Sequence, residues 1–270
     1  MLTKLLKYDF KSMFKLFLPL WAVLLVVSAI NRVFFGSGLQ VEGGLGLVNS
    51  LMVLLYILLI VAVMVVTTVI IIVRFYQGLL KDEGYLMFTI PVHPWQLITS
   101  KLVSALVISL LSSMVAVASV FIIASFPGMW DVLSQAWAVT AQEVPNFILL
   151  VILVVISFFV GMICSISQVY AAMALGHLAG SHRVGFSVLA FIVLNMAWST
   201  VSTIIGLFGY SDLTSSLVTV TSGAEATLNV DGFSNLMLIS TVWGLVLNLV
   251  RCAVHFVLTN YILSRKLNLE

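Results

Sequence analysis

Long apolar stretches without a charged residue dominate the chain. Those between Glu42 and Arg74 and between Lys101 and Asp131 contain 31 and 29 residues, and four others run between charged positions 15 and 32, 143 and 183, 183 and 212, and 231 and 251. A helix needs about 20 apolar residues to cross the hydrocarbon core. Open sheet is excluded there because its edge groups would lack hydrogen bonds. The pattern predicts six membrane helices, over about residues 16–35, 47–73, 102–126, 146–174, 184–208 and 237–262.

Composition agrees with this pattern and excludes several other classes. The 270 residues are 62% hydrophobic and only 8% charged, whereas soluble domains average about 25% charged. Soluble and disordered chains are therefore excluded, and two cysteines do not make a disulfide scaffold. The 12 basic and 10 acidic residues are too balanced to indicate nucleic-acid binding. The expected fold is an all-α membrane protein with a single transmembrane domain over residues 1–270.

The basic residues predict the orientation of the six helices, since Lys and Arg concentrate in cytoplasmic loops. With both termini in the cytoplasm, all of the 12 basic residues except Arg32 fall on the inner side or at its boundary. A signal peptide is the alternative interpretation of the first helix. We reject it because no small-residue cleavage site follows and because residues 1–15 are too long for a basic leader.

The N-terminal residues 1–15 have the pattern of a helix that lies along the membrane surface. One face carries lysines, and the other carries leucine, phenylalanine and methionine. Such a helix places its apolar side at the acyl boundary and its lysines among lipid head groups. It serves either as a simple anchor or as an elbow that also touches a cytoplasmic partner. The lysines are Lys4, Lys7, Lys11 and Lys15.

The loop of residues 74–101 is the longest cytoplasmic segment between the predicted spans. It carries a charged cluster at Lys81, Asp82 and Glu83, followed by Pro91 and Pro94. Pro91 disfavours helix at the preceding residue, whereas Pro94 suits the first position of a helix that continues into the third span. The residues alone fit either a short amphipathic helix or an ordinary solvated loop. On the outer side, the segment 209–235 is rich in Ser and Thr.

These features together resemble the membrane subunits of ABC-2 type ATP-binding-cassette exporters. The resemblance rests on KDEGYLMFTIPVHPWQLITSKL after the second span, the amphipathic N-terminus, six spans and the C-terminal NYILSRKLNLE. It implies a coupling helix in the 74–101 loop that contacts a separate cytoplasmic ABC ATPase, and a second permease subunit, identical or homologous. It also implies a bacterial plasma-membrane location. The implied ATPase contacts are Lys81, Asp82, Glu83, Tyr85, Leu86, Phe88 and Pro91.

The chain has no G-x-x-x-x-G-K-[ST] loop, so we expect it to be no ATPase. ATP and magnesium would bind to the partner, and no cofactor is expected on this chain. A secondary transporter or channel is the alternative function, which predicts broken helices or charged residues at the bilayer midplane. An intramembrane enzyme would need H-E-x-x-H, G-x-S-x-G or paired membrane aspartates, and these are absent.

A few polar residues interrupt the predicted spans. They either join helices by hydrogen bonds or line a substrate pathway. Arg251 and His255 are four residues apart and share one face of the last helix. Arg251 extends to the cytoplasmic interface if that helix crosses over about residues 232–250, and lies deeper if the helix starts near Ile239. His177 and His182 lack further ligands, so no metal site or catalytic residue is expected. The candidate residues are Gln168, Asn195, Asn248 and Arg251.

Overall fold

The computed structural model describes residues 2–36, 45–80, 94–125, 127–179, 182–214, 218–220, 226–228 and 230–265. Six of its helices are long and apolar enough to cross a membrane. The prediction of six helical spans is therefore confirmed, and the chain is a multi-pass membrane protein. The six helices are α1 (Leu2–Gly36), α2 (Leu45–Phe75), α4 (Pro94–Ala124), α6 (Phe147–His177), α7 (Arg183–Thr214) and α8 (Val230–Arg265).

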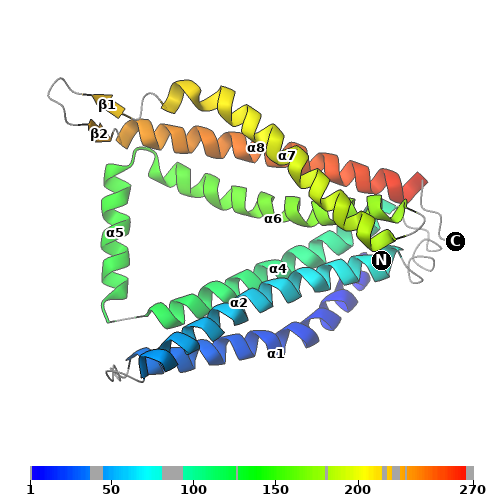
Figure 1. Ribbon diagram of the computed structural model, residues 1–270, viewed down its shortest axis with the longest axis horizontal. Coiled ribbons are helices and arrows are strands. Elements are labelled where there is room, and N and C mark those ends of the chain that lie inside the picture. The colour runs from blue at the N-terminus through cyan, green and yellow to red at the C-terminus, as the bar shows by residue number, and fades with distance from the viewer. Residues whose placement is uncertain are drawn as a thin grey trace. The chain divides into compact units, whose positions relative to one another are not determined.

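The chain forms two compact units, Met1–Met129 and Trp130–Glu270. In the first unit, α1, α2 and α4 run side by side (Figure 1). One core cluster joins Met13 and Phe17 of α1 to Ile108 of α4. A second cluster joins Leu24 of α1 to Tyr56 and Val63 of α2. Each of the three helices therefore buries an apolar stripe against the other two.

Small polar side chains of α4 hold this bundle together inside its apolar surface. Ser112 accepts a hydrogen bond from the indole nitrogen of Trp21 at 3.1 Å, and its hydroxyl lies 3.3 Å from that of Thr67. Tyr56 and Ser119 share a further hydrogen bond of 2.8 Å. Serine is small enough for close helix approach, and it still offers a hydrogen-bonding group in a medium without water. Ser112 of α4 thus bonds to both α1 and α2.

The predicted surface helix of residues 1–15 is not separated from the first span. α1 is one continuous helix of 35 residues that contains Pro19 in its interior. Met13 and Phe17, expected at the acyl boundary, are instead buried against α4, while Lys11 and Lys15 are exposed. Lys4 and Lys7 lie in α1, but their side chains lie outside the described part. Packing against Ile108 extends the bundle into this segment, so the boundary at residue 15 is not a structural one.

The region after α2 is described only in part. α2 continues into a π-helical turn, Tyr76–Leu80, in which Leu79 is fully buried. The predicted coupling residues, from Lys81 to Pro91, lie outside the described residues. α4 begins at Pro94, as predicted from the tolerance of proline at the first helical position.

In the second unit, α6 packs along both α7 and α8 (Figure 1). Two short strands, β1 (Val218–Val220) and β2 (Ala226–Leu228), pair antiparallel with Val218 opposite Leu228. They occupy the predicted outer segment 209–235 and add a small β-ribbon to the expected all-α fold. A further helix, α5 (Met129–Glu143), lies in the stretch between the third and fourth predicted spans, where no helix was predicted.

Candidate functional site

The second unit contains a cluster of polar side chains in the interior of its long apolar helices. Gln168 comes from α6, Trp198 from α7, and Arg251 and His255 from α8. Gln168 is 2% exposed and His255 is fully buried. Polar groups at such positions are costly unless they are hydrogen-bonded, and charged residues inside membrane helices are functional candidates by default.

The centre of the cluster is a hydrogen bond from the Arg251 guanidinium to the side-chain oxygen of Gln168. It connects α8 to α6. Beside it, the Ser167 hydroxyl approaches the Cys252 sulfur at 3.9 Å, so the two helices face each other with small side chains. The sequence contains no Asp or Glu in residues 144–211 or 232–269. The positive charge of Arg251 therefore has no counter-charge from α6, from α8 beyond residue 231, or from most of α7.

One helical turn further along α8, His255 receives a hydrogen bond of 3.0 Å from the indole nitrogen of Trp198 to its Nε2. The two rings meet edge to face, with their centroids 6.0 Å apart. Since Nε2 accepts, the neutral imidazole carries its proton on Nδ1. The contact joins α7 to α8, so the cluster links all three helices of this bundle.

Three nitrogen atoms of the cluster have no hydrogen-bond partner among the described residues. They are Nε2 of Gln168, Nε of Arg251 and Nδ1 of His255, and all three are buried. With Nε2 of His255 already accepting, each of them is a donor. The cluster thus offers N–H groups and one positive charge. Its chemistry suits an oxygen acceptor, either water or an anionic group, and contains no nucleophile–base pair.

Arg251 lies well inside its helix. α8 extends to Arg265, which is 14 residues beyond Arg251 and corresponds to about 21 Å of helix. The sequence favoured an arginine that reaches the cytoplasmic interface. The side chain reaches across to Gln168 of α6, and its depth in the membrane stays a prediction.

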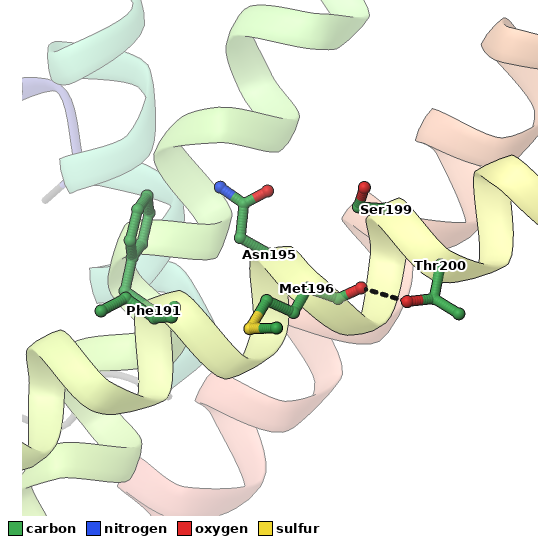
Figure 2. A pocket seen from close by; sticks show the side chains of 6 residues that line it. Phe191, Asn195, Met196, Ser199 and Thr200 are labelled. Carbon is green, nitrogen blue, oxygen red and sulfur yellow. Dashed lines mark hydrogen bonds between the residues drawn. The ribbon is translucent and has the colours of Figure 1, made fainter.

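A second polar feature is a hollow on one side of α7, with a volume of about 400 Å³. Figure 2 shows Asn195 and Ser199 projecting from the same side of this helix. Both are exposed, although α7 is a candidate membrane span from Arg183 to Leu207. Thr200 satisfies its hydroxyl within the helix, by donating to the Met196 carbonyl at 2.8 Å. The lining residues are Phe191, Ile192, Asn195, Met196, Ser199 and Thr200.

The four candidate residues of the predicted spans thus have different surroundings. Gln168 and Arg251 are in contact, Asn248 is half-buried one turn before Arg251, and Asn195 faces the hollow on α7. The pairing of His255 with Trp198 was not predicted. The spacing of Arg251 and His255 showed that they share a face of the helix. The sequence does not indicate which side chain accepts the hydrogen bond of the Trp198 indole.

Replacing Trp198 with phenylalanine is expected to lower the free energy of unfolding by about 1–3 kcal/mol, because the buried Nε2 of His255 would lose its donor. The matched control is Trp243→Phe, an exposed tryptophan on α8, for which little change is expected. Thermal unfolding in detergent measures both variants. Equal melting temperatures for the two would show that the hydrogen bond does not stabilise the bundle.

Comparison of the chain with family models, with curated proteins and with solved structures finds no match.

Proposed function

We propose that the chain is the transmembrane permease subunit of an ATP-driven ABC exporter in a bacterial plasma membrane. The observation that carries the proposal is the polar side of α7, which bears Asn195 and Ser199 within a candidate membrane span and which is exposed within its own unit. Uncovered polar side chains are unfavourable in lipid. A second membrane subunit or a water-filled passage would cover this side, and both are features of a transport complex.

The distribution of basic residues supports the proposed orientation. One end of the first unit contains the start of α1, the end of α2 and the start of α4. These segments carry the basic residues Lys11, Lys15, Arg74 and Lys101. In the second unit, α7 begins at Arg183 and α8 ends at Arg265. These helix ends would face the cytoplasm under the positive-inside rule.

Coupling to ATP rests on the resemblance of residues 80–101. In this proposal a cytoplasmic ATPase docks on Lys81, Asp82, Glu83, Tyr85, Leu86, Phe88 and Pro91, and a second permease, identical or homologous, completes the pathway. ATP-driven closure of the ATPases would move the coupling segments, and rigid helices would carry the shift into the membrane. The buried Leu79 and Phe75 would fix the inner end of α2 for that purpose.

Charge reversal at Glu83 tests the docking surface. Glu83→Lys is expected to reduce co-purification of the ATPase encoded beside this chain and to reduce its stimulated ATP hydrolysis, because a charged contact would become repulsive. Glu143→Lys, on the exposed helix α5, is the matched control and should leave both unchanged. Undiminished association of the Glu83 variant would contradict docking at this loop.

A secondary transporter or channel remains the alternative, and Arg251 is the observation that favours it. A charged residue in the interior of a membrane helix is typical of ion-coupled transport. The two functions differ in their energy source. Transport by reconstituted chain alone, driven by an ion gradient in the absence of ATP, would establish the alternative.

A further inference from the structure

Helix α5 has one apolar side that none of the other described helices of its unit covers. Trp130 is 74% exposed and Trp137 is 55% exposed, and Leu133 between them is also exposed. Spacings of three and four residues put these side chains on one face of the helix. Asp131, Gln135 and Gln142, spaced by four and seven residues, share another face. The helix is therefore amphipathic, although it is too short to span a bilayer.

The connections of α5 keep it at the level where two membrane helices end. Both α4 and α6 have 31 residues, or about 46 Å of helix, which matches the thickness of a bilayer with its head groups. Residues 125–128 lead from the end of α4 to α5, and residues 144–146 lead from α5 to α6. Because α5 is no span, both connections lie on the same side of the membrane.

These connections are too short for α5 to stand away from the surface. Its 15 residues make about 22 Å of helix. If α5 stood upright, α6 would hold its last residue at the surface, and its first residue would lie about 22 Å from the surface. Residues 125–128, which must connect that first residue to the end of α4, reach at most about 17 Å when fully extended. Gly128, at the end of this connection, adopts a left-handed turn conformation with φ 85°, which shortens its reach further. α5 must therefore run along the surface rather than away from it.

The attachment to α6 is fixed by packing and by backbone conformation. Trp137 meets Phe147, the first residue of α6, edge to face with a centroid distance of 4.8 Å. Asn146 before it is left-handed, with φ 57°, and the amide of Leu150 donates to its carbonyl. Figure 1 shows α5 turning away from the direction of α6 at this corner.

We propose that α5 lies in the head-group region of the bilayer, with Trp130, Leu133 and Trp137 in contact with lipid. Tryptophan suits this position because its ring is apolar and its N–H finds water or lipid oxygen. α5 carries Asp131 and Glu143 but no Lys or Arg. The contact is therefore made by apolar side chains and needs no anionic lipid. The inference requires only that α4 and α6 cross the membrane, and it is independent of ATP-driven export. In the proposed orientation, the surface is the outer one.

Spin labels on opposite faces of α5 test the inference. The full-length chain with Cys164→Ala and Cys252→Ala receives a single label through Leu133→Cys or, as the matched control two residues away, Gln135→Cys. Each variant is reconstituted in phosphatidylcholine vesicles, and collision rates are measured with oxygen, which enters lipid, and with a nickel chelate, which stays in water. Oxygen should dominate at position 133 and nickel at position 135, at both low and high salt.

Other patterns overturn the inference. Nickel dominance at both positions would place α5 in water, and shielding of position 133 from both reagents would mean that a protein surface, such as a second copy, covers it. If the cysteine-free chain fails to fold, tryptophan fluorescence provides a second test. The fluorescence of Trp130 and Trp137 is the difference between the native chain and the variant Trp130→Phe/Trp137→Phe. Lipids brominated near the carbonyl end of their chains should quench it, and iodide in water should not. Quenching by iodide instead would overturn the inference.

Discussion

Replacing Gln168 with leucine is expected to destabilise the second unit more than any other single change considered. The substitution removes the acceptor of the Arg251 guanidinium and leaves a charge without a partner between α6 and α8. Breaking a buried charged contact by removing one partner costs about 3–5 kcal/mol. No carboxylate in these segments can replace Gln168. The loss is measured as a lower melting temperature in detergent, and as a smaller monodisperse fraction on size exclusion.

Variants of Arg251 decide whether its unpaired charge causes the loss of stability in Gln168→Leu. Arg251→Met alone leaves Gln168 without a partner, at a cost of about 1–3 kcal/mol. The double variant Gln168→Leu/Arg251→Met replaces both partners with apolar groups, and it should recover most of the stability lost in Gln168→Leu. If instead the costs of the two single variants simply add, the two residues do not interact and the assigned contact is wrong.

Replacing Gly176 with alanine is expected to disrupt the junction of α6 and α7. A Cβ at this position would lie 2.5 Å from the backbone nitrogen of Ser187 and 2.6 Å from its Cα, in addition to striking its hydroxyl. Backbone atoms cannot rotate away, so α7 must shift. Overpacking of this kind costs about 1–3 kcal/mol. The change should lower the melting temperature of the chain.

Gly161 of the same helix provides the control. A Cβ there would meet nothing within 4 Å, so Gly161→Ala should be neutral or should stabilise the helix by up to about 1 kcal/mol. Similar melting temperatures for the two variants would mean that α6 and α7 do not approach as closely at Gly176 as described.

The six membrane helices could be predicted because long charge-free stretches need no tertiary information. α5 could not be predicted in the same way, since it has only 15 residues and carries Asp131 and Glu143. Such a segment is as typical of a loop as of a surface helix. The continuity of α1 was also missed. An amphipathic face can pack on lipid or on another helix, and only the position of Ile108 decides between them.

The polar cluster was predictable in its members but not in its contacts. Arg251 and His255 share a face because helical periodicity requires it. Their partners, Gln168 and Trp198, are 83 and 57 residues away in sequence. Such pairings depend on how the helices align along one another, which charge and hydropathy patterns do not define.

Reconstitution tests the central proposal most directly, namely that this chain is a permease driven by ATP hydrolysis in a separate ATPase. The chain is purified alone and together with the ATPase encoded beside it, and ATP hydrolysis is measured in vesicles. We predict that the chain alone hydrolyses no ATP, that the two form a stable complex, and that hydrolysis by the complex disappears when the P-loop lysine of the ATPase is replaced. A chain that never associates with that ATPase, in any membrane-like environment that keeps both proteins folded, would contradict the proposal.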